Sequence, residues 1–365
     1  MKHIINKKKE GLPLKKIVLT GGGTAGHVTP NIALVPKQIE NGYEIKYVGT
    51  KDGMEKQLVL DAGLDYEGIS SGKLRRYFSL KNFTDPFRVI KGYFDAKKIM
   101  KKFRPDIVFS KGGFVTVPVV YAAAKYKIPV IIHESDMTPG LANRLAIKKA
   151  TKVCHNFPET AAYLGEKAVH TGSPIRQELF EGNKLTALNM CGFTANKPII
   201  MVTGGSLGAE KVNKLVRAAL PTLLEKYQVA HLCGKEKLDE SLEGLEGYRQ
   251  FEYISDEMKD FFAMADLIIS RAGANSICEI VALEKPNVLI PLSAAVSRGD
   301  QILNAKSFAK QGFSEVLDED VATPEDLIHA VEKVFTNRNE YISNMQKSDG
   351  TGGVDSIIQL IKELS

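Results

Sequence analysis

Two stretches of this chain follow the same plan, in which an apolar run leads through a glycine-rich turn into a helix-like segment. The first, KKIVLTGGGTAGHVTPNIAL, covers residues 15–34, and the second, KPIIMVTGGSLGAEKVNKLV, covers residues 197–216. A buried strand that turns through glycines into a helix opens a parallel α/β domain, whose ligands bind beyond the carboxyl ends of the strands. Two such openings in 365 residues predict two domains.

Strand-like and helix-like segments alternate through both halves, which is typical of parallel sheets covered on both faces. The predicted strands after the two openings are EIKYVG, PDIVFS and PVIIHE in the first half, and QVAHLCG, YRQFEYI, ADLIISR and PNVLIPL in the second. We therefore predict an α/β fold with two Rossmann-like, doubly wound domains that face each other across a cleft.

The boundary between the domains is predicted where the alternation of strand-like and helix-like segments becomes irregular, around residues 151–195. We expect a basic prefix over 1–14, an N-terminal domain over 15–175 and a C-terminal domain over 176–365. The final amphipathic stretch, VDSIIQLIKEL, is predicted to be a helix that could pack on the N-terminal domain.

Composition narrows the class of protein. An apolar fraction of 44% and a charged fraction of 25% are typical of a globular protein, and no apolar run is long enough to span a membrane. Four scattered cysteines without a C-x-x-C pair argue against disulfides and structural zinc. With no signal-peptide core at the start, these features predict a protein on the cytoplasmic side that needs no metal and no cofactor.

The first glycine turn raises the question of a dinucleotide, because Gly21, Gly23 and Gly26 spell G-x-G-x-x-G. A dinucleotide site also requires an acidic residue at the end of the second strand to bind the ribose. That strand ends in Gly49 and Thr50, without an acid. The turn is therefore interpreted as a place where backbone amides approach the phosphates of another ligand.

The densest polar pattern lies in residues 265–305, ADLIISRAGANSICEIVALEKPNVLIPLSAAVSRGDQILNA. Glu279 follows a glycine turn, where a carboxylate can accept hydrogen bonds from both ribose hydroxyls. Gln301 and Asn304 carry amides that can donate to and accept from sugar hydroxyls. Taken singly, each of the three is also compatible with an ordinary solvated helix face.

In their order along the chain, several motifs resemble the MurG family of UDP-N-acetylglucosamine transferases, which convert lipid I to lipid II in peptidoglycan synthesis. The motifs are GGGTAGH, SKGGFVTVPVV, HES, GSPIR, VTGGSLGA, RAGANSICE and DQILNA. The resemblance implies the GT-B fold, UDP-GlcNAc as donor, and undecaprenyl-diphosphate-linked MurNAc-pentapeptide (lipid I) as acceptor.

The resemblance also implies roles for individual residues. The donor contacts that it implies are Arg176, Ser206, Ile254 with the uracil, the turn containing Ala274, Asn275 and Ser276 beside the diphosphate, Glu279 with the ribose, and Gln301 and Asn304 with GlcNAc. Thr24, Ala25 and Gly26 resemble the loop that faces the acceptor. The sequence departs from the family at Ala25, where glycine is usual, and at Ser135 and Asp136, where Gln-Asn is common. A donor contact at this position would therefore be made by the Asp136 carboxylate and not by an amide side chain.

The implied reaction is a direct displacement with inversion, in which the muramyl 4-hydroxyl attacks the anomeric carbon and UDP leaves. Such a step needs a base for the hydroxyl and charge stabilisation for the diphosphate. His27, just before a predicted helix, is the leading candidate for the base, because a helix N-terminus favours neutral imidazole. His133 and Glu134 are alternatives, and His27 could instead cap the helix or donate to a phosphate.

Positive charge is concentrated in residues 73–104, which hold eleven lysines or arginines and two acids, a net +9 against +6 for the whole chain. Seven aromatic residues are interleaved with these charges. The pattern predicts a face for an anionic membrane surface, with the protein peripheral on the cytoplasmic side. The alternative is a solvated helix whose aromatics belong to the core. No nucleic-acid-binding module accompanies the charge, so no nucleic-acid partner is expected.

Two other functions stay open from the sequence. The same fold could transfer a sugar to a different lipid or glycan acceptor, since the implied donor motifs lie mainly in the second half. The chain could also be a nucleotide-sugar-binding subunit without activity of its own.

Overall fold

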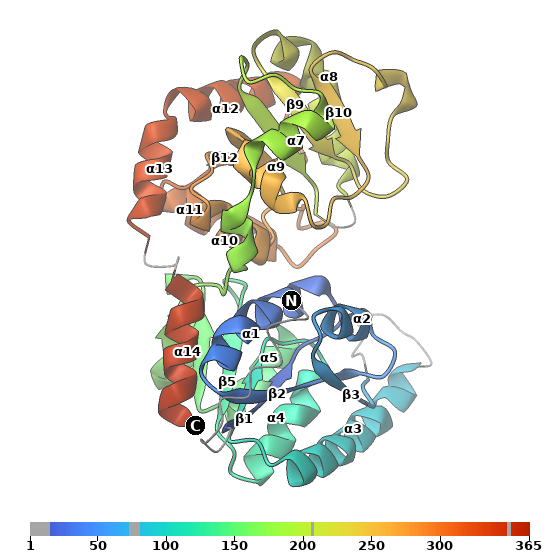
Figure 1. Cartoon of the computed structure of the whole chain (residues 1–365), viewed down its shortest axis with the longest axis vertical. Coiled ribbons are helices and arrows are strands. Elements are labelled where there is room, and N and C mark those ends of the chain that lie inside the picture. The colour runs from blue at the N-terminus through green and yellow to red at the C-terminus, as the bar shows by residue number, and fades with distance from the viewer. Residues whose placement is uncertain (1–14, 73–80, 206–207, 349–351) are drawn as a thin grey trace. The chain divides into compact units, whose positions relative to one another are not determined.

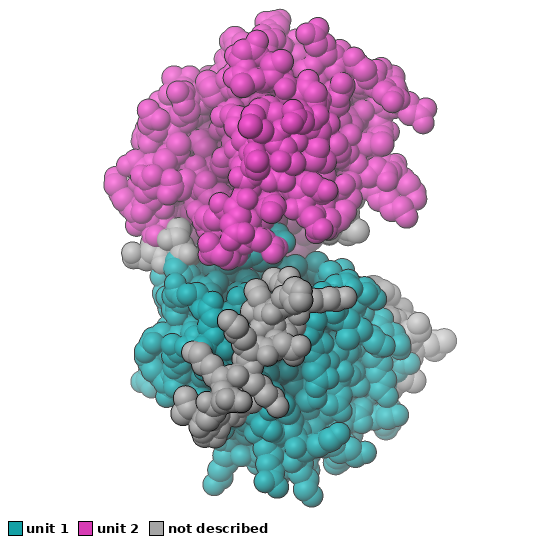
Figure 2. All heavy atoms as spheres, in the orientation of Figure 1, with its two compact units in different colours: residues 1–176, 352–365 teal, residues 177–351 magenta. Residues whose placement is uncertain are grey.

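The computed structural model describes residues 15–72, 81–205, 208–348 and 352–365 (Figure 1). The chain divides into two compact units (Figure 2): unit 1 comprises the chain up to Arg176 together with Gly352–Ser365, and unit 2 comprises Gln177–Thr351. The prefix, part of the basic segment (73–80) and Ser206 lie outside the described residues.

In unit 1 the described strands form a seven-stranded parallel sheet in the order β3-β2-β1-β4-β5-β6-β7. The strands are β1 (Lys15–Thr20), β2 (Tyr43–Thr50), β3 (Asp65–Ile69), β4 (Ile107–Ser110), β5 (Val130–Glu134), β6 (Lys152–His155) and β7 (Ala168–His170). Strands β4 and β5 are buried along their whole length, which explains their nearly unbroken apolar sequence.

Helices cover both faces of this sheet. They are α1 (Thr29–Glu40), α2 (Met54–Asp61), α3 (Lys81–Phe103), α4 (Thr116–Lys125), α5 (Leu141–Ala146), α6 (Ala161–Leu164) and α14 (Gly353–Leu364). Alternate residues of β1 enter different cores, as the two-residue repeat of a strand requires. Val18 packs with Ile99 of α3 and Val119 of α4, whereas Ile17 and Leu19 pack on the side of α1 and α14.

The last helix, α14, belongs to unit 1 although it follows unit 2 along the chain. Its residues Ile357, Ile358 and Ile361 are buried in the core that α1 also covers, and Figure 1 shows the two helices next to each other. The Lys15 ammonium donates to the carbonyl oxygen of Ser365 at 2.9 Å. The first strand and the final helix are therefore held in one unit.

In unit 2 the described strands form a six-stranded parallel sheet in the order β10-β9-β8-β11-β12-β13. The strands are β8 (Ile199–Thr203), β9 (Gln228–Leu232), β10 (Tyr248–Phe251), β11 (Leu267–Ser270), β12 (Asn287–Leu289) and β13 (Glu315–Val316). The helices are α7 (Lys184–Cys191), α8 (Glu210–Lys226), α9 (Met258–Met264), α10 (Ala274–Ala282), α11 (Asp300–Lys310), α12 (Pro324–Thr336) and α13 (Arg338–Gln346). Val216 of α8 and Val331 of α12 share one core cluster.

The predicted pair of parallel α/β sheets is confirmed, but four short strands are missing from the prediction. Three of them, β3, β7 and β13, lie at sheet edges. An edge strand is only half covered, so its sequence need not be apolar, and DYEGI in β3 is an example. Within the described residues, no helix combines the length and the hydropathy needed to cross a membrane.

Candidate active site

Three loops of unit 1 leave the carboxyl ends of the neighbouring strands β1, β4 and β5 and so lie at one edge of the sheet. The loops are residues 21–28, 111–115 and 135–140. The structure brings the predicted unit 1 residues Thr24, Ala25, Gly26, His27, Glu134 and Asp136 to this edge. The short 3-10 turn η1 (Ala25–His27) precedes α1, so His27 stands before that helix.

The first and second loops interlock through glycine backbone. The Gly22 amide donates to the Gly112 carbonyl at 3.3 Å. Gly113 has φ +93°, and a Cβ there would lie 2.3 Å from the Gly22 carbonyl oxygen. Only glycine fits this position, because a side chain would both strain the backbone and displace the first loop.

A buried carboxylate supports the first loop from α2. Glu55 accepts hydrogen bonds from the Thr50 amide at 2.9 Å, the Thr50 hydroxyl at 2.6 Å and the Gly23 amide at 3.3 Å. The amides of Gly22 and Gly23 are therefore engaged within the protein, and a carboxylate beside them disfavours a phosphate. In this structure neither of these two amides is free to bind a diphosphate.

The imidazole of His27 is oriented by the first loop. Its Nδ1 lies 2.9 Å from the Gly22 carbonyl oxygen and 3.3 Å from the Thr24 hydroxyl. Because a carbonyl only accepts, Nδ1 carries the proton and donates it, which leaves the lone pair on Nε2. His27 is thus held as the tautomer that can accept a proton at Nε2.

The surroundings of His27 also favour its neutral form. Burial lowers the pKa of His27, and the Lys111 cation lowers it further. The Gly22 carbonyl and the Asp136 and Glu55 carboxylates act in the opposite direction, but they do not cancel the effect of burial. Burial, and not the helix dipole expected from the sequence, is the largest cause of the lowered pKa of His27.

Glu134, at the end of β5, organises the third loop. One carboxylate oxygen accepts from the Asp136 amide at 3.1 Å, and the other accepts from the Gly140 amide at 3.1 Å and the Asn143 side chain at 2.8 Å. Burial, and the neighbouring Asp136 charge, raise the pKa of Glu134 to about 7. Both oxygens are engaged in holding the loop, so the geometry favours His27 over Glu134 as the base.

Lys111, directly after β4, is buried and contacts the end of β5. Its ammonium lies 2.7 Å from His133 Nδ1 and 2.6 Å from the Ser135 hydroxyl. His133 Nε2 donates to the Gly172 carbonyl at 2.9 Å, so Nδ1 accepts from Lys111. Burial and the Lys111 charge hold the pKa of His133 well below its usual range. Since its lone pair is taken, His133 is not placed to act as a base.

In unit 2 the loops after β11 and β12 lead into α10 and α11, which carry most of the predicted donor residues. The residues expected as a turn beside the diphosphate form the first part of α10, which begins at Ala274 after the N-cap Gly273. Ala274, Asn275 and Ser276 therefore lie in its first helical turn, and Glu279 lies one turn further on. Backbone amides at a helix start have no acceptor within the helix and favour anions.

The two α11 residues predicted to bind the sugar, Gln301 and Asn304, also hydrogen-bond to the loops after β12 and β11. Gln301 accepts from the Leu292 amide at 3.0 Å through its side-chain oxygen. The buried Asn304 side chain donates to the Ala272 carbonyl at 3.3 Å. α11 thereby ties the loop after β12 to the loop after β11.

Two further predicted donor residues lie away from these loops. Ile254 is buried in the segment that follows β10. Arg176 is the last residue of the first segment of unit 1.

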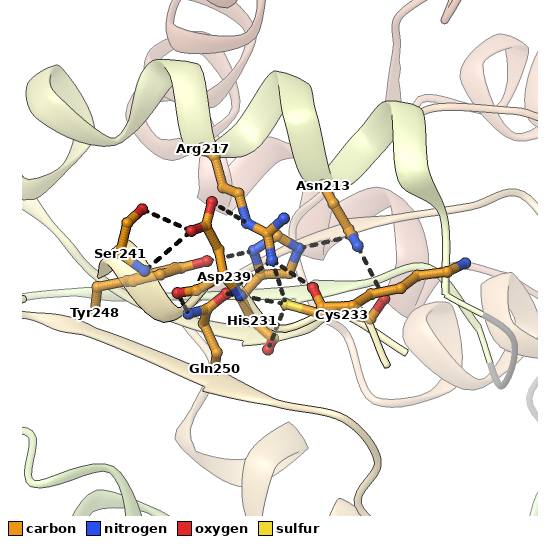
Figure 3. A network of polar contacts seen from close by, with 9 residues as sticks. Asn213, Arg217, His231, Cys233, Asp239, Ser241, Tyr248 and Gln250 are labelled. Atoms are coloured by element: carbon orange, nitrogen blue, oxygen red, sulfur yellow. Dashed lines mark hydrogen bonds and ion pairs between the residues drawn. The ribbon is translucent and has the colours of Figure 1, made fainter. Parts of the chain in front are cut away.

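A buried polar network lies beside the end of the second glycine-rich loop (Figure 3). The Tyr248 hydroxyl lies 2.9 Å from His231 Nδ1, and His231 Nε2 lies 3.0 Å from the Asn213 side-chain oxygen. The Asn213 amide then donates to the Cys233 carbonyl at 2.9 Å. A Cβ on Gly208 would lie 2.1 Å from the Cys233 carbonyl oxygen. The network therefore holds in place the carbonyl against which Gly208 packs.

Sequence reasoning missed three features of these sites: Glu55, Lys111 and the network around His231. Lys111 had a usable signal, because it stands directly after a buried strand inside the motif SKGGF. The contact of Glu55 with Gly23 and the contacts of His231 with Tyr248 and Asn213 had none, since these partners are distant in sequence. Among the described residues, no group of three or more histidine, cysteine or acidic side chains is placed to hold a metal ion.

Comparison with known proteins adds to this geometry. The glycosyltransferase family 28 N-terminal domain matches residues 17–155, and the C-terminal domain of the same family matches residues 199–361. The chain is 63% identical over 353 residues to the UDP-N-acetylglucosamine–N-acetylmuramyl-(pentapeptide) pyrophosphoryl-undecaprenol N-acetylglucosamine transferase of Lachnospira eligens, covering 96% of this chain and 100% of the relative. The enzyme of the same name from Lachnoclostridium phytofermentans is 62% identical, with 96% and 99% covered.

A solved structure agrees with the sequence comparison. The crystal structure of Acinetobacter baumannii MurG superposes with a TM-score of 0.74 at 27% identity and covers 96% of this chain and 99% of its own. The resemblance based on the seven sequence motifs is confirmed, as is the GT-B fold class. This chain is a glycosyltransferase that belongs to glycosyltransferase family 28 and, within it, to the MurG family.

Proposed function

We propose that this glycosyltransferase transfers GlcNAc from UDP-GlcNAc to the 4-hydroxyl of MurNAc in lipid I, with inversion at the anomeric carbon, to give lipid II. The names of its relatives support the two substrates. The observation that carries the chemistry is the bond between His27 Nδ1 and the Gly22 carbonyl, which leaves Nε2 as a proton acceptor at neutral pH.

In the proposed step the acceptor oxygen attacks the anomeric carbon on the face opposite UDP. The bond from that carbon to the diphosphate oxygen breaks, UDP leaves with the electron pair, and the hydroxyl proton passes to His27 Nε2. A positioned base of this kind typically accelerates a reaction by about 10²–10⁴-fold. Glu134 is the second candidate for the base, supported by its pKa of about 7.

Unit 2 supplies the proposed donor site. The N-terminal turn of α10, with Ala274, Asn275 and Ser276, would face the diphosphate, where it would stabilise charge as UDP leaves. Glu279 would accept from the ribose hydroxyls, and Gln301 with Asn304 would bind GlcNAc.

The remaining proposed contacts rest on the family resemblance. Ile254 would bind uracil through its backbone. Arg176, Ser206 and Asp136 would add donor contacts, and Thr24, Ala25 and Gly26 would line the acceptor side. No metal and no cofactor enter the proposal.

We further propose that α3 binds the anionic cytoplasmic face of the membrane. Phe87, Ile90 and Phe94 recur at helical spacing and are 74%, 55% and 54% exposed. Arg88 and Lys91, between them in sequence, are also exposed. An exposed apolar stripe bordered by cations suits the headgroup region of an anionic bilayer. Tyr93 and Phe103, by contrast, pack into the core or against it.

A matched pair of acceptors tests the reaction. Labelled UDP-GlcNAc is incubated with a lipid I analogue, with its 4-deoxy-MurNAc version and with its 6-deoxy-MurNAc version. We expect transfer to the first and third only, and a β-linked product by the anomeric proton coupling in NMR. Transfer to the 4-deoxy analogue, or an α-linked product, would contradict the proposal, and UDP-GlcNAc binding without transfer to any acceptor would favour a binding subunit.

A further inference from the structure

A buried ion pair joins the turn after β13 to the loop after β11. Arg271 directly follows β11, and its Nη2 lies 2.5 Å from Glu319 Oε2. The two side chains are only 10% and 2% exposed. Removing both charges from water is costly, and such pairs are often no more stabilising than apolar residues of similar size. A role in overall stability alone therefore explains the pair poorly.

The partners of the pair show what it connects. The other oxygen of Glu319 accepts from the Ser293 amide at 2.6 Å, in the loop after β12. Arg271 Nη1 donates to the Ile290 carbonyl at 3.0 Å, and its backbone amide lies 3.4 Å from the Thr203 carbonyl at the end of β8. The Glu319 carboxylate and the Arg271 guanidinium thus join the segments that follow β11, β12 and β13.

The adjacent residue extends the same connection to α8. Asp320 accepts from the Ser293 hydroxyl and from the Lys211 ammonium, the latter at 2.7 Å. Lys211 lies in the first turn of α8, directly after the second glycine-rich loop. The turn that contains Glu319 and Asp320 therefore holds the starts of three segments that leave the same edge of the sheet.

Two of these segments carry the proposed donor contacts. Helix α10 begins at Ala274, three residues after Arg271. Gln301 of α11 accepts a hydrogen bond from the amide of Leu292, which precedes Ser293 in the sequence. A change in the distance between the two loops would move α10 relative to α11, and with them the diphosphate contacts relative to the sugar contacts. Binding sites lose affinity when their supporting residues no longer hold them in place.

We propose that Glu319 is a positioning residue for the nucleotide-sugar: through Arg271 and the Ser293 amide it sets the spacing between the loops after β11 and β12. The inference rests on the proposed function, because it takes these loops as the UDP-GlcNAc site. Glu319 acts through other residues and does not itself contact the donor.

The direction in which the Kd for UDP changes in the variant Glu319→Gln distinguishes a positioning role from a purely electrostatic effect. Glu319→Gln removes a negative charge near a site for an anionic ligand, which by charge alone would tighten UDP binding. Positioning predicts the opposite, a Kd for UDP raised roughly tenfold, a size typical of coupled neighbours. The KM for UDP-GlcNAc is expected to rise with it, while the KM for the lipid I analogue stays within about twofold.

A second variant guards against loss of folding. In the double variant Arg271→Met, Glu319→Met, no unpaired charge is left buried, so the protein is expected to keep its melting temperature. Its Kd for UDP is still expected to rise roughly tenfold, because the connection between the loops is gone. The matched control is Glu315→Gln, which breaks the 2.7 Å pair with Lys333 elsewhere in unit 2 and should leave the Kd unchanged.

Kd is measured by isothermal titration calorimetry with UDP, and folding by thermal melting. A folded double variant with the wild-type Kd, or tighter binding by Glu319→Gln, overturns the inference alone. Failure of the wild-type chain to bind UDP overturns the proposed donor site and the inference together.

Discussion

The carbonyl of Gly22 accepts a hydrogen bond from His27 five residues later, while the amide of the same glycine donates to Gly112 in the second loop. The tautomer of the histidine is therefore set by a peptide group that is itself held by a neighbouring loop. The position of the Gly112 backbone therefore affects whether Nε2 of His27 is the nitrogen that can accept a proton.

Replacing His27 tests its part in the reaction. We expect His27→Ala and His27→Gln to lower kcat by about 10²–10⁴-fold, because the attacking hydroxyl loses its proton acceptor. The KM for UDP-GlcNAc should stay within about twofold, since the proposed donor contacts lie in unit 2. Initial rates with labelled donor measure both constants, and near-wild-type turnover in either variant would remove His27 from the mechanism.

The pH profile distinguishes His27 from Glu134. A base must be deprotonated, so activity is full above its pKa and falls as the pH drops through it. The pKa of His27 is below its ordinary value of 6.5, whereas that of Glu134 is raised to about 7. The acidic limb of kcat/KM is therefore expected to have its midpoint below pH 6.5. A midpoint near 7 that persists in His27→Gln would point to Glu134 instead.

Gly113→Ala tests the contact between the two loops. Its Cβ would lie 2.3 Å from the Gly22 carbonyl, at a φ of +93°, so the carbonyl that orients His27 must shift. We expect a stability loss of about 1–3 kcal/mol together with a loss of kcat of at least tenfold. Gly42→Ala is the control, because φ there is +79° but no atom lies within 4 Å. It should cost about 1 kcal/mol in urea unfolding and leave kcat unchanged, and equal kcat losses would refute the argument.

The stability of unit 2 is expected to fall in mild acid. Burial, and the Arg217 charge, lower the pKa of His231 to about 3, against an ordinary value of 6.5. The unfolded chain therefore takes up the proton first, and stability is lost as the pH falls from about 6.5 towards about 3. Between pH 7 and pH 5 the His231 contribution to this loss is about 2 kcal/mol. Urea unfolding of wild type and His231→Gln at both pH values measures it, and identical pH dependence would contradict it.

Membrane binding is expected to depend on the exposed face of α3. Arg88→Gln with Lys91→Gln should weaken binding to anionic vesicles by at least tenfold, at about 1 kcal/mol for each cation. Phe87→Ser with Phe94→Ser should weaken binding at all salt concentrations, since it removes apolar contact. Co-sedimentation with phosphatidylglycerol vesicles provides the measurement. Tyr163→Ser, at an exposed aromatic elsewhere in unit 1, is the control, and an equal loss there would argue against α3.

The sequence predicted most of both sheets because central parallel strands are buried on both faces and leave unbroken apolar runs, as IVFS does in β4. It could not predict which loop amides are engaged. In the sequence, the glycines at 22 and 23 are typical of a phosphate-binding loop. The structure shows that the Gly23 amide instead donates to the carboxylate of Glu55 in α2. Likewise, Lys111 and His133 are ordinary polar residues in the sequence, and only the sheet brings them within 2.7 Å.

The position of α14 has a consequence for how the chain is made. The core beneath α1 needs Ile357, Ile358 and Ile361, which are synthesised only after the whole of unit 2. Unit 2 is continuous in sequence, whereas unit 1 cannot complete this core until the last residues of the chain have been synthesised. Domains usually fold in order from the N-terminus as the chain is made, but unit 1 depends on the final helix, so a nascent chain stalled before α14 would leave the apolar surface of unit 1 open to chaperones.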